Sequence, residues 1–417
     1  MTAGDMLELE EEIRAAHMES ARKEMEARLQ AVADGFPPVD GGGRPLSRRE
    51  RIGMQVRSCF GVLNLQVVSG WSEAERRSVT PARRALFEGR RGAMTPLLER
   101  NVTVAALEAG SFEKGASLCA CWGVKISDDK ARTTVESVAE RCLAGRLPKR
   151  CGDAAGKDDT LIAMADGWNV RLRGPKWGLE DAQDGERVTW KDVKSATIFK
   201  AADIVPDGAR RRALLHKRVV AVPADAGPEV FGAALEREAV RMGMDEARRT
   251  YFFSDGGAYL WNIFECRFEA VAVGTLDYYH AMEHLGEAAA HLFPDVGERA
   301  EWLKARRAEV KERGGGALGE MLSDLLAKLP VPAEGVEVVE REARYFEKHK
   351  RHMDYDRRAS EGLPIGSGAV ESLCGQFQNR LKRRGQFWSR KGFADILRAY
   401  VWHMNGDLDL AISPQAA

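Results

Sequence analysis

The stretch Leu161-Ile162-Ala163-Met164-Ala165-Asp166-Gly167-Trp168-Asn169-Val170 decides the fold, because it is an apolar strand interrupted by a single carboxylate. Alternation along a strand puts Asp166 on the same face as Met164 and Trp168. A carboxylate on a buried face is unfavourable unless a positive charge meets it. The segment therefore predicts a core strand that carries a functional acid, although Asp-Gly is also an ordinary turn sequence.

Further elements follow this strand in an order that is typical of one fold class. We expect strands at 161–172, 189–199 and 217–222, a helix at 228–242, and strands at 250–254 and 270–276. Three strands, a helix and two more strands suit a mixed sheet covered by helices, in the order of the RNase H-like fold. The sequence therefore predicts an α/β core.

Two more carboxylates stand where an element ends or begins. Asp255 closes the aromatic strand of Thr250-Tyr251-Phe252-Phe253-Ser254-Asp255-Gly256-Gly257, and the glycines allow a sharp turn or a close approach to a ligand. Glu371 lies in Gly366-Ser367-Gly368-Ala369-Val370-Glu371-Ser372, at the start of a helix that Ser367 could cap. Taken singly, Asp255 fits a turn and Glu371 fits a residue that complements the helix dipole. Four cations follow on or just after the same helix, at Arg380, Lys382, Arg383 and Arg384, and we expect their charges to hold DNA phosphates without reading sequence.

Taken in order, these segments resemble the DDE transposases of bacterial insertion sequences, in particular the ISKra type, in the group related to Mutator-like and hAT elements. The resemblance covers most of the chain. It is carried by Ala165-Asp166-Gly167, Trp190-Lys191-Asp192-Val193-Lys194, Ser254-Asp255-Gly256, Trp261-Asn262-Ile263, Leu276 to Leu285, Gly366 to Ser372, Arg380-Leu381-Lys382, Gly385 and Trp388-Ser389. Ahead of these, Met94-Thr95-Pro96, Ser111 to Ala116 and Trp122-Gly123-Val124 resemble the segment that precedes the family's catalytic domain.

The resemblance implies a metal-dependent phosphoryl transferase with Asp166, Asp255 and Glu371 as catalytic residues and metal ligands. Three clustered carboxylates repel one another unless cations lie between them, and Mg²⁺, with Mn²⁺ as substitute, prefers oxygen ligands. Two such ions about 4 Å apart can activate the attacking hydroxyl and neutralise the leaving oxygen. The expected reactions are cleavage at the element ends and joining to target DNA. The expected partners are double-stranded DNA, as terminal inverted repeats and target, and further copies of the chain in a homodimer or larger homo-oligomer.

A second motif leaves two interpretations open. The run His280-Ala281-Met282-Glu283-His284 spells H-x-x-E-H, which in a zincin peptidase would hold zinc. That interpretation leaves Asp166 and Asp255 unexplained, and we expect no stoichiometric zinc. The resemblance instead makes Asp277 and His280 a supporting pair for the active site or the flanking DNA, with a buried histidine bonded to Asp277 as the alternative.

The region before the core is expected to bind DNA. Helices at 112–122 and 127–143, separated by Gly123-Val124, have the spacing of a helix-turn-helix, which also occurs in proteins that bind no DNA. Lys130 and Arg132, near the start of the second helix, are the candidates for contact with bases. The expected domains are 1–45 (a charged helix and a Gly/Pro linker), 46–150 (a mainly helical DNA-binding region), 151–281 (the first part of the core), 282–361 (an all-helical insertion) and 362–417 (the final core helices).

Composition adds constraints on compartment and function. The chain of 417 residues carries 63 basic and 63 acidic residues, so DNA contacts require local basic patches rather than net charge. Seven cysteines without a CxxC pair favour reduced thiols, and no segment suits a signal peptide or a membrane span. We therefore expect a bacterial cytoplasmic, nucleoid-associated protein. Two alternative functions are a captured transposase that regulates without transfer, and a stand-alone RNase H-like nuclease.

Overall fold

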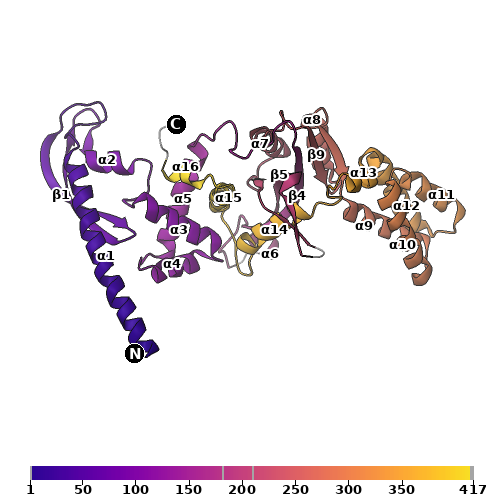
Figure 1. Ribbon diagram of the computed structural model, residues 1–417, viewed down its shortest axis with the longest axis horizontal. Helices are drawn as coiled ribbons and strands as arrows, with labels where there is room; N and C mark the ends of the chain where they lie inside the picture. Colours follow the sequence, from indigo (N-terminus) through magenta and orange to yellow (C-terminus); the bar gives the residue numbers. More distant parts are fainter. Residues whose placement is uncertain (1, 181–182, 209–210, 414–417) are drawn as a thin grey trace. The chain divides into compact units, whose positions relative to one another are not determined.

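The computed structural model describes residues 2–180, 183–208 and 211–413 (Figure 1). The chain divides into two compact units. One comprises Met1–Leu147 with Arg398–Ala417, and the other comprises Pro148–Leu397. The division therefore groups residues 398–417 with the N-terminal region, whereas the sequence analysis grouped them with the core.

The first unit opens with a long helix and a small antiparallel sheet. Helix α1 (Ala3–Asp34) is capped by Thr2, and strands β1 (Ser47–Ser58), β2 (Gly61–Ser72) and β3 (Arg77–Val79) pair in the order β1-β2-β3. The sequence predicts one short alternating strand here, from Val62 to Val68, which lies within β2. In β1 the first half is charged and exposed, and alternating burial begins only near Met54. The sequence of β1 therefore lacks the apolar alternation by which a strand is recognised.

The remaining helices of this unit bury apolar side chains against one another. They are α2 (Pro81–Phe87), α3 (Pro96–Glu108), α4 (Phe112–Cys121), α5 (Asp128–Ala144) and α16 (Leu408–Ile412). The expected helix pair before the core is confirmed as α4 and α5. Ser127 caps α5, since its hydroxyl accepts a hydrogen bond from the Lys130 N–H at 3.1 Å.

The second unit is built on a mixed five-stranded sheet. Its strands are β4 (Thr160–Arg173), β5 (Val188–Lys200), β8 (Arg218–Ala221), β9 (Arg249–Ser254) and β10 (Ala272–Leu276), in the order β10-β9-β4-β5-β8. Strands β4, β9 and β10 are parallel, whereas β5 runs antiparallel to both β4 and β8. All five predicted strands are confirmed.

Helices flank both faces of this sheet. Side chains of Leu161, Ala163 and Ala165 share one core with α7 (Pro228–Arg241) and α8 (Ala258–Arg267). On the alternate face of β4, Trp168 stacks on Phe377 of α14 (Gly368–Leu381) with ring centroids 5.8 Å apart. Trp168 also contacts Phe393 of α15 (Arg390–Met404).

Strands β4 and β5 extend beyond their neighbours as a two-stranded ribbon. Strand β9 pairs with β4 only as far as Met164, and β8 pairs with β5 only from Ser195 to Ile198, yet β4 and β5 stay paired out to Arg173 and Val188. A bridge between Leu172 and Trp388 lies along the ribbon. The smaller elements nearby are α6 (Asp184–Arg187), η1 (Ala201–Asp203), β6 (Ile204–Asp207) and β7 (Arg211–Leu214).

The stretch between β10 and α14 is helical, as the sequence predicts. It consists of α9 (Tyr278–Leu292), α10 (Val296–Arg313), α11 (Leu318–Lys328), α12 (Ala333–His349), η2 (Lys350–His352) and α13 (Tyr355–Ser360), and these helices lie together in Figure 1. Their apolar faces join the core shared with α7 and α8. Among the described helices, none combines the length and apolar character needed to cross a membrane.

Candidate active site

Three aspartates lie in register just beyond the point where the parallel pairing of β4, β9 and β10 ends. The β4–β9 register pairs Met164 with Phe253, so Asp166 and Asp255 each follow two residues later. The β9–β10 register pairs Ser254 with Leu276, so Asp255 and Asp277 each follow one residue later. The carboxyl ends of adjacent parallel strands meet at one sheet edge, which brings Asp166, Asp255 and Asp277 to the same edge.

Asp166 is a half-buried acid in a negative environment. Burial raises its pKa, and the neighbouring charges of Asp255 and Glu371 raise it further. The Gly167 N–H, which donates to the carboxylate at 2.6 Å, and the charge of His280 act in the opposite direction. The predicted triad therefore converges: the carboxylates of Asp255 and Glu371 lie close enough to Asp166 to disfavour its ionisation.

Asp255 lies in a turn that the helical region holds in place. Its carboxylate accepts hydrogen bonds from the Gly257 N–H at 2.9 Å and the Ser254 hydroxyl at 3.3 Å. Its carbonyl accepts a hydrogen bond from the Tyr345 hydroxyl of α12 at 3.2 Å. Gly256 has a φ of 94°, and a Cβ there would lie 2.6 Å from the Tyr345 hydroxyl. Only glycine fits this position without displacing Tyr345.

Glu371 projects from the first turn of α14 and is exposed. Ser367 occupies the N-cap position, but its side chain does not cap the helix as expected. Instead the Ser367 hydroxyl donates to Glu371 Oε1 at 2.8 Å. That contact holds one oxygen of the carboxylate toward the helix start and leaves the other available to a ligand.

Asp277 is a fully buried acid that joins three elements. One carboxylate oxygen accepts from the His280 N–H at 2.9 Å and so caps α9, and the other accepts from the Ser367 N–H. Its own N–H donates to the Ser254 carbonyl at 2.9 Å. The supporting role expected of Asp277 thus has a concrete form, in which one carboxylate fixes the starts of α9 and α14. The bond to His280 uses that residue's backbone, not its ring.

Sequence reasoning missed several polar neighbours of Asp166. The Cys374 thiol is hydrogen-bonded to the Asp166 carboxylate, and burial and that negative charge raise the pKa of the thiol. Burial, followed by the charges of Asp192 and Asp255, raises the pKa of Tyr259. Cys374 follows Glu371 by one helical turn, and that spacing was the available signal. Tyr259 carried no sequence signal, because its place depends on how α8 packs.

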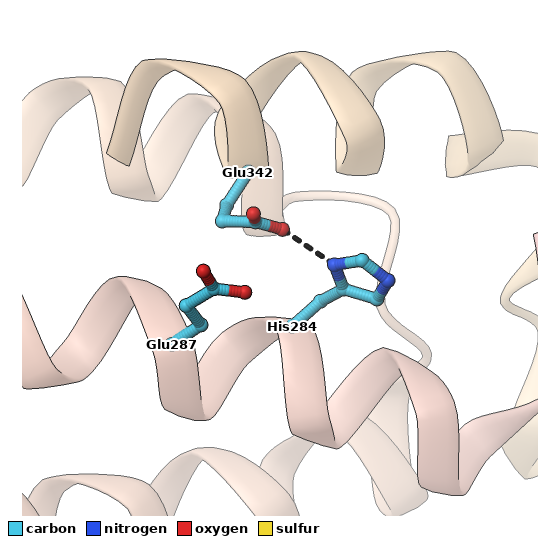
Figure 2. A group of neighbouring side chains, drawn as sticks. All are labelled: His284, Glu287 and Glu342. Atoms are coloured by element: carbon cyan, nitrogen blue, oxygen red, sulfur yellow. Dashed lines mark hydrogen bonds and ion pairs between the residues drawn. The ribbon is translucent and has the colours of Figure 1, made fainter. Parts of the chain in front are cut away.

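The described residues contain another acidic group, which lies in the helical region (Figure 2). The ligand atoms of His284, Glu287 and Glu342 all lie within 4.8 Å of one another, and His284 Nδ1 is 2.6 Å from Glu342 Oε2. Arg341 already pairs with Glu287 at 2.5 Å and Glu342 at 2.7 Å. A cation at this position would have to compete with that guanidinium, so the group is better explained as an ion-pair network than as a metal site.

The candidate triad of Asp166, Asp255 and Glu371 is more widely spaced than that, since its ligand atoms do not all fall within 4.8 Å of one another. Carboxylates that share one small ion must approach closely, whereas those that flank a pair of ions about 3.5–4 Å apart need not. No Lys or Arg side chain pairs with these three carboxylates among the described residues.

The H-x-x-E-H motif does not assemble as a zinc site. His280 Nδ1 lies 3.3 Å from Glu283 Oε2 of its own helix. His284 instead bonds Glu342 and stacks on Tyr345 with ring centroids 3.9 Å apart. The acidic group around His284 contains neither His280 nor Glu283. The two histidines that would bind zinc in a zincin therefore have different partners.

The predicted DNA-contacting cations differ in exposure. Arg380 is 3% exposed and its guanidinium lies over the Trp388 ring, so it supports the core rather than presenting charge to solvent. Of the same set, Arg383 and Arg384 are exposed and Lys382 is half-buried.

Both candidate base-contacting residues of α5 are engaged within the first unit. Arg132 pairs with Asp129 at 2.6 Å and Glu136 at 2.5 Å. The Lys130 ammonium donates to the Arg91 carbonyl at 3.3 Å, and burial lowers the pKa of this lysine. A role in DNA contact would require either side chain to exchange these partners for DNA.

The chain matches no protein-family model and no curated protein. The function must therefore be inferred from the residues of the site. These are three aspartates aligned at one edge of the sheet, a glutamate that a separate helix brings close to Asp166, and a cluster of cations on the loop after that helix.

Proposed function

We propose that this chain is a DDE transposase, a metal-dependent polynucleotidyl transferase that cleaves DNA at element ends and joins those ends to target DNA. One observation carries the proposal. Asp166 and Asp255 stand at corresponding positions of adjacent parallel strands, and Glu371 of α14 acts on the same Asp166 carboxylate. Two acids from a sheet edge and one from a later helix are what the resemblance to DDE enzymes implies.

The sheet supports a finer assignment of the core to the RNase H-like class. Its strand order, β10-β9-β4-β5-β8, places the first strand of the core in the centre. On one side of β4, strand β5 pairs antiparallel with both β4 and β8. On the other side, strand β9 pairs parallel with both β4 and β10. The helical region between β10 and α14 corresponds to the insertion that the resemblance implies.

The donor set fits Mg²⁺, with Mn²⁺ as its substitute. Asp166, Asp255 and Glu371 offer only carboxylate oxygens, which hard divalent cations prefer. Burial, and then the negative charges of Asp255 and Glu371, raise the pKa of Asp166, and no lysine or arginine forms an ion pair with Asp166 among the described residues. When bound there, Mg²⁺ would neutralise this charge and polarise a phosphate oxygen toward attack.

The chain's own residues have separable tasks at this site. The Gly167 and Gly257 N–H groups orient the carboxylates of Asp166 and Asp255. The Ser367 hydroxyl orients Glu371. Lys382, Arg383 and Arg384 supply positive charge for the DNA backbone, without reading its sequence. The nucleophile is water in cleavage and the freed 3′-hydroxyl in joining, so no covalent protein intermediate is needed.

We propose that the protein acts in an assembly bound to DNA. Double-stranded DNA is the partner, as terminal inverted repeats and as target, and α4 with α5 is the candidate reader of the ends. Joining two element ends to one target favours a homodimer or a larger homo-oligomer. A bacterial cytoplasmic, nucleoid-associated location follows from these roles.

The test uses a plasmid that carries the reading frame's flanking DNA on both sides of a marker. With purified protein and Mg²⁺ or Mn²⁺ we expect cleavage at the flanks and joined products in a target plasmid. Asp166→Asn, Asp255→Asn and Glu371→Gln should each abolish both reactions while retaining DNA binding in gel shift, because amides are poorer metal ligands. Asp324→Asn, an exposed α11 carboxylate paired with Lys328, is the matched control and should react as the wild type does.

Other outcomes point to the alternative functions. Substantial cleavage by any triad variant would remove that residue from the site. Metal-dependent cleavage without joining, and without preference for the flanks, would favour a nuclease. Binding to the flanks without cleavage by the wild-type protein would favour a regulator derived from a transposase.

A further inference from the structure

The tryptophans of the second unit, Pro148–Leu397, differ in exposure. Trp261 and Trp388 are 1% and 8% exposed and belong to the core. Trp190, on the β5 side of the ribbon, is 56% exposed, and Trp177 is 40% exposed. A large aromatic side chain left this open on a strand loses the burial that normally stabilises it. Trp190 is therefore available to stack on a ligand.

Cations surround Trp190 on the ribbon. Arg171 lies directly across from Trp190 in the β4–β5 register, and its guanidinium is 5.8 Å from the centroid of that ring. The Lys382 ammonium, from the end of α14, is 5.4 Å from the same centroid. Two elements far apart in sequence thus place positive charge on one exposed indole.

The surroundings hold these cations in place. The Arg171 guanidinium donates to the carbonyls of Lys382, at 3.4 Å, and Arg383, and it also lies 5.1 Å from the centroid of Phe387. Phe387 packs on Trp177 with ring centroids 4.9 Å apart. Trp190 itself adds to this cluster without being enclosed by it.

The local charge favours a polyanion. Arg173, Arg383 and Arg384 are exposed around the same ribbon end. Two of the described carboxylates near the ribbon have cationic partners: Glu186 pairs with Lys176 at 2.7 Å, and Asp192 pairs with Lys194 at 3.4 Å. An exposed indole within a basic surface matches the combination by which proteins hold unpaired nucleic-acid strands, with aromatic rings for bases and cations for phosphates.

We propose that Trp190 is a stacking platform for an unpaired base of the DNA substrate, with Arg171 and Lys382 facing the phosphates beside that base. This inference rests on the proposed function and specifies its substrate as DNA with at least one base out of the duplex. Arg171 lies five residues beyond Asp166 on β4, about 17 Å at 3.3 Å per residue.

The experiment measures binding to a fluorescein-labelled thymine oligomer of about 20 nucleotides and to a blunt duplex of the same length, both in EDTA. Trp190→Ala should weaken binding to the oligomer by about 5- to 100-fold, and duplex binding by less than about 2-fold. Trp190→Phe retains a ring and should stay within about 3-fold of the wild type on both probes. Val296→Ala, which removes an exposed apolar side chain from α10, is the control and should change neither.

A second readout locates the contact directly. An oligomer with 5-iodouracil in place of thymine should crosslink to Trp190 under ultraviolet light, and mass spectrometry should place the adduct in residues 188–194. Absence of oligomer binding by the wild type, equal weakening on both probes in Trp190→Ala, or crosslinks confined to other segments would overturn the inference. Circular dichroism melting confirms that each variant is folded.

Failure of this inference differs from failure of the proposed function. Because binding is measured in EDTA, it does not require catalysis. A protein that cleaves at the flanks but binds the oligomer independently of Trp190 would refute the platform alone. A protein whose oligomer binding depends on Trp190 but that never cleaves DNA would refute the transposase proposal alone.

Discussion

The carboxylate of Asp277 accepts a hydrogen bond from the backbone N–H of Ser367, ninety residues further along the chain. Its second oxygen accepts from the His280 N–H at 2.9 Å. A single buried acid therefore holds the start of α14, the helix that carries Glu371, against the end of β10. Gly366 lies so close that a Cβ there would be 3.3 Å from Asp277 Oδ2 and 2.6 Å from the Tyr279 ring. Glu371 owes its position to this junction.

Asp277→Asn is expected to loosen that junction. An amide offers one acceptor where two N–H groups need one each, so one donor is left without a partner in a buried place. We expect a loss of about 1–3 kcal/mol in the free energy of unfolding, measured by urea denaturation. We also expect the Mg²⁺ concentration for half-maximal cleavage to rise, because Glu371 is no longer held near Asp166 and Asp255.

The Ser367→Ala variant separates the effect of this junction on stability from its effect on the Mg²⁺ requirement. It keeps the backbone N–H bonded to Asp277 but removes the hydroxyl that orients Glu371. Stability should change by less than about 1 kcal/mol, whereas the Mg²⁺ requirement should still rise. An Asp277→Asn protein that is destabilised but keeps the wild-type Mg²⁺ requirement would show that Asp277 is structural only.

Divalent cations should stabilise the folded protein through the triad. The raised pKa of Asp166 means that its ionised form is disfavoured in the native state, so this group makes the protein less stable as the pH rises through that pKa. Asp166→Asn should therefore gain on the order of 1 kcal/mol in EDTA at neutral pH. Saturating MgCl₂ should raise the Tm of the wild type more than that of the variant, as scanning calorimetry can measure. Equal shifts would place the bound Mg²⁺ elsewhere.

Acid should weaken the helical region through His349, which packs on Trp261 with ring centroids 4.9 Å apart. Burial lowers the pKa of His349 from 6.5 to about 4. Above pH about 6.5 the ring is neutral in both states, and as the pH falls toward 4 only the unfolded chain takes up the proton. This histidine then lowers the free energy of unfolding by about 1.4 kcal/mol per pH unit. In His349→Phe, urea denaturation between pH 7 and pH 5 should show a smaller decline, and an unchanged decline would contradict the assignment.

The cations that follow α14 should bind phosphates without reading sequence. Neutralising Lys382, Arg383 and Arg384 together should weaken binding to specific and random duplexes alike. Each lost phosphate contact should lower the slope of log affinity against log salt by about 0.9. Replacing Lys130 and Arg132 should instead reduce the preference for element ends. Titrations of both duplexes at several salt concentrations decide this, and the reverse result would exchange the two roles.

The core strands could be predicted because their signals are local. The alternation from Leu161 to Val170 fixes which side chains face the core, and Asp166 stands out against it. Strand β1 could not be recognised in the same way, because its first half is charged and its pairing with β2 determines its structure. The burial of Arg380 under Trp388 and the exposure of Trp190 depend on how separate segments meet, which no spacing within one segment reveals.

The helical region between β10 and α14 has a consequence for the timing of assembly. During synthesis Asp166, Asp255 and Asp277 are complete while Glu371 is still to be made, so the nascent chain holds only part of the acid set. Asp277 then has no Ser367 N–H to bind, and the starts of α9 and α14 cannot be joined. The site is complete only after the whole helical region has been made and folded. The hydrogen bond between Asp277 and the Ser367 N–H is therefore a late event in folding. A truncated product that ends within this region would carry Asp166 and Asp255 and lack Glu371.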